Sequence, residues 1–128
     1  EEVAFVSAQE SLEEGVSFIR DNSDIKILFV TLGNKGSIAY YKDEKIYCGG
    51  IHQEHVVDTT GAGDTFCGAV LSRILELGTD ALTEKDIREM LLFANAAASI
   101  VVTRKGALCS MPEPEEIRAA SSLIDKVL

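Results

Sequence analysis

One apolar run constrains the fold of this chain more than any other feature. Residues 25–32 are short, apolar and rich in branched side chains, which is typical of a strand buried on both faces. Upstream, Ser11-Leu12-Glu13-Glu14 has the Ser-x-x-Glu form of a capping box, and apolar residues follow at helical spacing. A helix over about 11–21 followed by such a strand predicts an α/β layered domain with a parallel core strand near 26–32.

The rest of the chain adds a hairpin and further helices, giving three to four helices in all. The turn residues Lys42-Asp43-Glu44 separate two short strands, so an antiparallel hairpin is expected there, and Gly49-Gly50 is expected to loosen the chain after it. The chain has 128 residues, which indicates one domain or part of one. The predicted elements are strands at 37–41 and 45–48 and helices at 65–77, from 83 to a stop near 106, and at 113–128.

Composition excludes several classes of partner. The net charge of −9 repels nucleic acid and anionic lipid, so we expect neither nucleic acid nor membrane as a partner. No apolar run approaches the ~18 residues of a membrane span, and the N-terminus lacks the basic start of a secretory signal. The three cysteines, Cys48, Cys67 and Cys109, are far apart and read as reduced, mostly buried thiols of a cytoplasmic protein.

The stretch that carries chemistry is Asp58-Thr59-Thr60-Gly61-Ala62-Gly63-Asp64, which opens a predicted helix. Its two glycines lack a Cβ and let the backbone turn sharply. Unpaired N–H groups and the positive end of the helix dipole then make an anion site, suited to a phosphoryl group in transfer. Asp64 would lie beside that group and accept the proton of an attacking hydroxyl. The alternative is a glycine-rich loop that ends in an N-cap, because neither the Walker A nor the dinucleotide pattern is present.

Residues 58–66 resemble the C-terminal signature of the ribokinase-like (PfkB) sugar kinase family. Three further blocks resemble that family in the same order. Val30-Thr31-Leu32-Gly33-Asn34-Lys35-Gly36 is similar to its Thr-Leu-Gly-x-x-Gly nucleotide loop, and residues 93–99 and 102–107 are similar to the two blocks that follow the signature. The resemblance covers about residues 26–112 and implies the C-terminal part of a three-layer α/β/α domain.

The resemblance implies an ATP-dependent kinase, in which a sugar or nucleoside hydroxyl attacks the γ-phosphate of ATP. Asp64 matches the family's catalytic base, in contact with the acceptor, and Gly61, Ala62 and Gly63 match its anion hole. Asn95 falls where the family places a side chain near the adenosine, although by itself it reads as a helix-surface amide. The implied nucleotide contacts are Thr31, Leu32, Gly33, Asn34, Lys35, Gly36, Gly63 and Asn95.

The resemblance also implies two metal ions. Many members hold a potassium ion beside the anion hole, several ligands being backbone carbonyls, and Arg104 would bind through its carbonyl. Mg²⁺ accompanies ATP, and alignment places Glu2 at the Glu of the family's Asn-x-x-Glu element, with the Asn outside this chain. A solvated terminal carboxylate is the other interpretation of Glu2. The positions that match potassium ligands are Asp58, Thr60, Val101, Arg104, Gly106 and Ser110.

Family members are more than twice this length, and their N-terminal part, with the sugar-binding Gly-Gly signature and the lid, has no counterpart here. Residues 1–128 are therefore expected to form the C-terminal nucleotide- and phosphate-binding part of a kinase domain. Alone it should phosphorylate no sugar, because catalysis needs both substrates in near-attack geometry. The expected partners are a small sugar and ATP. A homodimer of the full-length protein is compatible with the sequence.

Two blocks, 93–98 and 103–107, look most like fructokinase or ribokinase, so fructose is the favoured acceptor. Ribose, 2-keto-3-deoxygluconate, a nucleoside and a phosphomethylpyrimidine remain as alternatives. A non-catalytic nucleotide-binding domain that kept the phosphate loop is a different class of function. Asp64 argues against that class, because anion binding alone does not require a carboxylate beside the anion.

Overall fold

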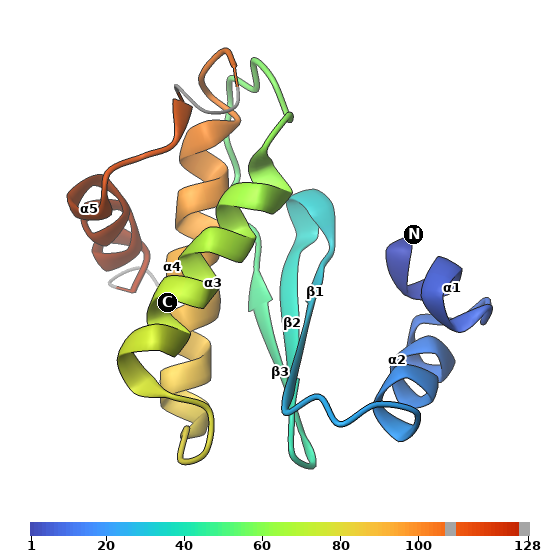
Figure 1. The fold of residues 1–128 in the computed structure, drawn as a ribbon. Coiled ribbons are helices and arrows are strands. Elements are labelled where there is room, and N and C mark those ends of the chain that lie inside the picture. Colours follow the sequence, from blue (N-terminus) through green and yellow to red (C-terminus); the bar gives the residue numbers. More distant parts are fainter. Residues whose placement is uncertain (107–109, 126–128) are drawn as a thin grey trace.

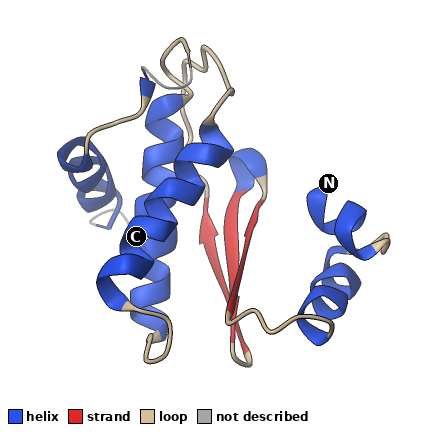
Figure 2. Ribbon diagram, viewed as in Figure 1, coloured by secondary structure: helices blue, strands red, loops and turns tan. Residues whose placement is uncertain are grey.

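A three-stranded sheet lies between two helical layers in the computed structural model, which describes residues 1–106 and 110–125 (Figure 1). Figure 2 shows α3, α4 and α5 on one side of the strands and α1 and α2 on the other. None of the helices in the described part of the chain is long and apolar enough to cross a membrane. In order, the elements are α1 (Glu2–Ser7), α2 (Leu12–Asp21), β1 (Ile27–Thr31), the 3₁₀ turn η1 (Gly33–Lys35), β2 (Gly36–Tyr41), β3 (Glu44–Gly49), α3 (Ala62–Leu77), α4 (Glu84–Val101) and α5 (Pro114–Asp125).

The sheet has the order β1-β2-β3, and both pairings are antiparallel. The predicted hairpin is therefore confirmed, but residues 1–106 and 110–125 contain no parallel partner for the strand expected near 26–32. In the described residues β1 pairs antiparallel with β2, with Ile27 opposite Tyr41. The cause is the connection between them, because η1 only reverses the chain and a parallel neighbour needs a crossover of a dozen or more residues.

Both faces of β1 are covered, as its apolar composition predicts. Ile27 and Phe29 pack against the main core, which α3 and α4 share with the sheet. Leu28 and Val30 lie in a second cluster with Val16 of α2. Alternate side chains of one strand thus enter two cores, which is what an α/β/α arrangement requires.

Helix positions agree with the sequence prediction except near the ends of the elements. The six-residue α1 was not predicted, because it is too short to show an apolar period. It packs on α2 where Gly15 leaves room for Val3 and Ser7. The helix predicted from 83 ends at Val101, before Gly106, and residues 126–128 of the last predicted helix lie outside the described residues.

The cysteines differ in exposure. Cys48 is half-buried, and its burial raises the pKa of the thiol. Cys67 on α3 is exposed, so the expectation of mostly buried thiols is wrong for this residue. Cys109 lies outside the described residues.

Candidate active site

Two glycines hold the predicted nucleotide loop against the end of the hairpin. Gly36 has φ 104°, and an ideal Cβ built on it would lie 2.5 Å from the nitrogen of Gly50 and 2.6 Å from the carbonyl carbon of Gly49. The backbones are joined there, because the Gly50 nitrogen donates to the Lys35 carbonyl at 3.1 Å. The positive φ and the close approach both require glycine at position 36.

A cavity of about 430 Å³ lies beside this crossing and brings the predicted blocks together. It is lined by residues of the nucleotide loop, of the anion loop and of α4. Leu32 and Lys35, which the resemblance also assigns to the nucleotide, are not among its lining residues. The predicted residues that line it are Thr31, Gly33, Asn34, Gly36, Ala62, Gly63 and Asn95.

Sequence reasoning missed another part of this cavity wall. Ile51, His52 and Gln53, from the loop after β3, also line it, as does Ser99 one turn after Asn95. The one feature of the sequence that could have pointed to these loop residues is their position, because the loop joins the hairpin to the anion loop. It has no motif of its own, so the sequence did not single it out.

The anion loop leaves amide groups unpaired at the start of α3. The nitrogens of Gly63 and Asp64 donate to no oxygen within residues 1–106 and 110–125, whereas the Ala62 nitrogen donates to Thr59 at 3.3 Å. Gly61 takes the left-handed conformation with φ 83° immediately before the helix. Unpaired N–H groups at the positive end of a sixteen-residue helix form an anion-binding element.

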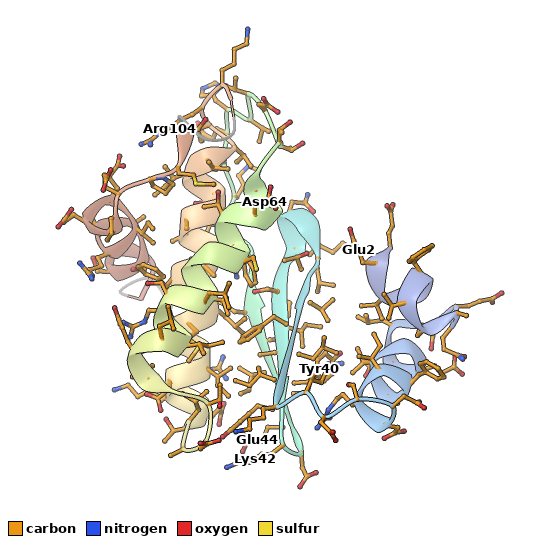
Figure 3. All side chains as sticks on the ribbon, viewed as in Figure 1. Glu2, Tyr40, Lys42, Glu44, Asp64 and Arg104 are labelled. Atoms are coloured by element: carbon orange, nitrogen blue, oxygen red, sulfur yellow. The ribbon has the colours of Figure 1, made fainter. Side chains whose placement is uncertain are left out.

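Asp64 is exposed at the N-terminal end of α3 (Figure 3). It follows Gly63, which lines the 430 Å³ cavity, but its own side chain lines a second cavity, of about 590 Å³, between α3, α4 and α5. The carboxylate makes no hydrogen bond to the described residues and so remains available to a ligand. The turn that contributes the unpaired amides therefore also holds the predicted base.

Gly63 is a glycine that the fold itself does not require. Its φ lies outside the left-handed range, and a Cβ added there would meet no atom within 4 Å. In a folded full-length protein we expect Gly63→Ala to preserve stability or raise it by about 0.5–1 kcal/mol. The same methyl group at a phosphate site should lower kcat/KM for ATP by about 10²-fold, because misplacement by ~1 Å can cost that much.

Thermal unfolding and steady-state kinetics of the same Gly63→Ala preparation test this prediction. Gly78→Ala is a suitable comparison, because Gly78 is also unobstructed but has φ 74°. That change should cost stability and leave ATP kinetics alone. Unchanged ATP kinetics in Gly63→Ala would show that no phosphate approaches this backbone.

Asn95 is buried and holds α4 to the sheet. It is 7% exposed. Its carbonyl oxygen accepts from the Ser37 hydroxyl at 2.9 Å, and its amide nitrogen donates to the Cys48 and Gly49 carbonyls at 3.3 and 3.2 Å. The helix-surface interpretation of Asn95 is therefore wrong. The residue lines the cavity, but its side-chain amide is hydrogen-bonded to Ser37 of β2 and to Cys48 and Gly49 of β3, and so holds that end of the hairpin in place.

We expect Asn95→Ala to destabilise the fold by about 1–3 kcal/mol, because it leaves buried groups without partners. Urea unfolding of the full-length protein measures this directly. Asn22→Ala is a control, since Asn22 is an exposed residue that donates to Phe18 at the end of α2. Equal midpoints for the two variants would contradict a structural role for Asn95.

The predicted potassium ligands come from two segments that are joined by backbone hydrogen bonds. The nitrogens of Val57 and Asp58 donate to the Val102 carbonyl at 2.8 and 3.2 Å. The Asp58 carboxylate accepts from the Thr60 nitrogen at 2.9 Å. Hydrogen bonds from Thr60, with a smaller contribution from the Gly106 backbone, lower the pKa of Asp58.

The Arg104 guanidinium is occupied elsewhere. It donates to the Ser110 carbonyl at 3.4 Å and to the Glu116 carboxylate at 2.5 Å, and the hydrogen bond from Arg104 lowers the pKa of Glu116. Any contribution of Arg104 to a cation site would therefore come from its carbonyl. No group of three or more His, Cys, Asp or Glu side chains in the described ranges could hold a metal ion.

Glu2 is separated from the other predicted site residues. It lies on α1, on the opposite side of the sheet from α3 (Figure 3). Its carboxylate is fully exposed. An exposed carboxylate that lines neither cavity supplies no support for a magnesium role.

Comparison with known proteins identifies the family. Residues 1–114 match the model of the pfkB family carbohydrate kinase. The chain belongs to the pfkB family. The resemblance seen in the four sequence blocks is thus confirmed.

Relatives in the pfkB family include fructokinases and ribokinases. Probable fructokinase-4 of Arabidopsis thaliana is 36% identical over 121 residues, which are 93% of this chain and 36% of the relative. A fructokinase from Vibrio cholerae O395, solved in a fructose-, ADP- and calcium-bound form, has a TM-score of 0.79 and 31% identity over 91% of this chain and 37% of its own. An Arabidopsis thaliana ribokinase complexed with ribose and ATP has a TM-score of 0.76 and 33% identity over 94% of this chain and 38% of its own.

These comparisons confirm the ribokinase-like α/β fold. The chain spans only about a third of the length of the relatives it matches. Solved pfkB-like neighbours hold ATP or ADP together with magnesium, calcium or potassium ions.

Proposed function

We propose that the full-length protein containing this chain transfers the γ-phosphate of ATP to a hydroxyl of a small sugar, with fructose as the expected acceptor. The observation that carries this proposal is the 430 Å³ cavity, where the predicted nucleotide loop meets the anion loop and its unpaired amide nitrogens. Membership of the pfkB family and relatives named fructokinase support the choice of reaction and acceptor.

In the proposed reaction, the sugar hydroxyl loses its proton to the Asp64 carboxylate as its oxygen forms a bond to the γ-phosphorus. The bond between that phosphorus and the β,γ-bridging oxygen breaks, and ADP leaves. The unpaired amides of Gly63 and Asp64 stabilise the negative charge spread over the transferring group. Base and amides belong to consecutive residues at one helix start, so the fold fixes their relative positions.

A potassium ion would suit the hard oxygen donors that the Asp58 turn and the end of α4 carry, and backbone hydrogen bonds join these two segments. We propose Asp58 and Thr60 with the carbonyls of Val101, Arg104 and Gly106 and with Ser110 as its ligands. A cation there would supply positive charge beside the anion loop. Mg²⁺ would be bound together with ATP and would supply positive charge to its phosphate groups.

We also propose that residues 1–128 are the nucleotide- and phosphate-binding part of the kinase domain. Asp64 borders the anion loop, but the described residues around it include no sugar-binding motif. The acceptor must then be held by the rest of the protein, and residues 1–128 alone should turn over no sugar. Measurable fructose-dependent ATP hydrolysis or phosphorylation by this chain alone would contradict that assignment.

A phosphorylation assay of the full-length protein across fructose, ribose, 2-keto-3-deoxygluconate and adenosine tests the function. We expect the highest kcat/KM with fructose, measured as ADP release and as sugar phosphate by mass spectrometry. A higher value with another acceptor would replace fructose while keeping the kinase reaction. ATP binding with no phosphorylated product from any acceptor would favour a non-catalytic nucleotide-binding domain.

A further inference from the structure

The backbone carbonyl of Lys35, in the predicted nucleotide loop, accepts two hydrogen bonds from the end of the hairpin. One comes from the Gly50 nitrogen at 3.1 Å and the other from the Tyr47 hydroxyl at 2.7 Å. A carbonyl oxygen has two lone pairs, so these two donors use its full capacity. Tyr47 lies in β3 and Gly50 directly follows that strand, so both tie the loop to the end of β3.

The turn inside this loop has little to hold its shape by itself. Its helical part, η1, is three residues long, and the Lys35 nitrogen donates to the Leu32 carbonyl at a distance of 3.3 Å. Hydrogen bonds of such 3₁₀ turns have poor geometry. Gly33 and Gly36, with φ 61° and 104°, lie at the two ends of the turn and allow an unrestrained backbone many conformations. Contacts from outside the loop are therefore needed to fix it.

Burial does not explain where the Tyr47 side chain lies. Tyr47 is 51% exposed and belongs to neither hydrophobic core. Its backbone is fixed separately, because it pairs with Ile38 of β2 and its carbonyl accepts from the Arg88 guanidinium of α4 at 3.4 Å. Within the described residues, the one hydrogen bond of the side chain is that to Lys35. The hydroxyl group thus links a firmly held strand to a weakly held loop.

We infer that Tyr47 is a positioning residue for the nucleotide loop. Neither Tyr47 nor Lys35 lines the 430 Å³ cavity, whereas Asn34 and Gly36, on either side of Lys35, both line it. The hydroxyl group therefore acts through the Lys35 carbonyl on the cavity wall, which it holds in place before a ligand arrives. That the ligand is ATP rests on the proposed function, but the restraint of the loop does not.

The strength of one hydrogen bond sets the size of the effect. Loss of a neutral hydrogen bond should lower the population of the restrained loop by at most about tenfold. A ligand that binds only this form of the loop is then bound more weakly by the same factor. Once ATP is bound, the loop is held by the ligand as well, so the rate of phosphate transfer should change little. Tyr47 is therefore expected to affect the KM for ATP and to leave kcat unchanged.

Tyr47→Phe in the full-length protein tests this role, because it removes the hydroxyl group and keeps the ring. We expect the Kd for ATP, measured by calorimetric titration, to rise about 3–10-fold. The KM for ATP should rise with it, while kcat and the KM for the acceptor stay within about twofold of wild type. A Kd for ATP equal to that of wild type would overturn the inference.

Tyr41→Phe is the matched control. The Tyr41 hydroxyl also donates to a backbone carbonyl, that of Thr79 at 3.0 Å, but neither residue lines the 430 Å³ cavity. Tyr41 is buried, so its variant should lower Tm at least as much as Tyr47→Phe does, yet keep wild-type affinity for ATP. Equal weakening of ATP binding in both variants would show a general effect of stability and would also overturn the inference.

Hydrogen exchange of the protein without nucleotide follows the loop directly. In the peptide that contains residues 30–36, we expect amide exchange about 3–10-fold faster in Tyr47→Phe than in wild type or Tyr41→Phe. Weaker ATP binding without faster exchange would mean that Tyr47 contacts the nucleotide itself, and the positioning role would be wrong. Faster exchange in a protein that binds no ATP would refute the proposed function and leave the positioning role intact.

Discussion

Replacing Asp64 by Asn in the full-length protein is expected to lower kcat by about 10²–10⁴-fold. The amide keeps the shape of the side chain but cannot accept the hydroxyl proton. Asp64 is exposed and makes no hydrogen bond to the described residues, so the substitution should leave the fold unchanged. ATP affinity should stay within a few-fold of wild type, because Gly63 and the cavity wall are untouched.

Steady-state kinetics and calorimetric ATP titration measure the two quantities separately. Asp43→Asn is the matched control, since Asp43 is another exposed aspartate, in the turn between β2 and β3 and away from the cavity. It should reproduce wild-type kinetics. Turnover by Asp64→Asn equal to that of Asp43→Asn would remove Asp64 from the reaction and favour a nucleotide-binding domain without catalysis.

The second large effect is expected at Gly36. Gly36→Ala puts a Cβ into the backbone of Gly49 and Gly50 at a residue whose φ of 104° and ψ of −138° suit glycine. Backbone strain and overpacking each cost about 1–3 kcal/mol. Together they come to about 2–6 kcal/mol, which reaches the lower end of the total stability of an ordinary domain, about 5–15 kcal/mol. We expect a mostly insoluble or thermally labile protein.

Gly33→Ala is the matched control for this prediction. Gly33 lies in the same loop and has φ 61°, but a Cβ there would meet no atom within 4 Å. Gly33→Ala should lower the free energy of unfolding only by the strain of one left-handed residue, about 1 kcal/mol. Differential scanning calorimetry of the soluble fractions compares the two variants. A Gly36→Ala protein as stable as Gly33→Ala would show that the backbone at Gly36 can move away from that of Gly49 and Gly50.

The sequence predicted most elements because their signals are local. The capping box at Ser11 begins α2, where the Ser11 hydroxyl accepts from the Glu14 nitrogen at 3.2 Å, and Thr83 with Asp86 begins α4 in the same way. Strand pairing was less predictable. An apolar strand with two covered faces does not reveal its neighbours, so the antiparallel pairing of β1 came only with the structure.

The candidate site shows the same division. The anion loop was predicted because glycines before a helix act through adjacent backbone groups. The roles of Asn95 and Gly50 depend on residues far away in the chain. Asn95 binds groups 46 to 58 positions distant, and Gly50, expected to loosen the chain, instead lies against the backbone of Asn34 and Gly36. No local pattern encodes those contacts.

Among the described residues, those that line the 430 Å³ cavity all lie from Thr31 to Val102. The part of the cavity that this chain supplies to the ATP side of the proposed reaction thus comes from one continuous stretch of the chain. A recombination event upstream of β1 would transfer that part intact and exchange only what precedes it. Kinases of this architecture could in this way acquire a new acceptor while keeping the same ATP-binding residues.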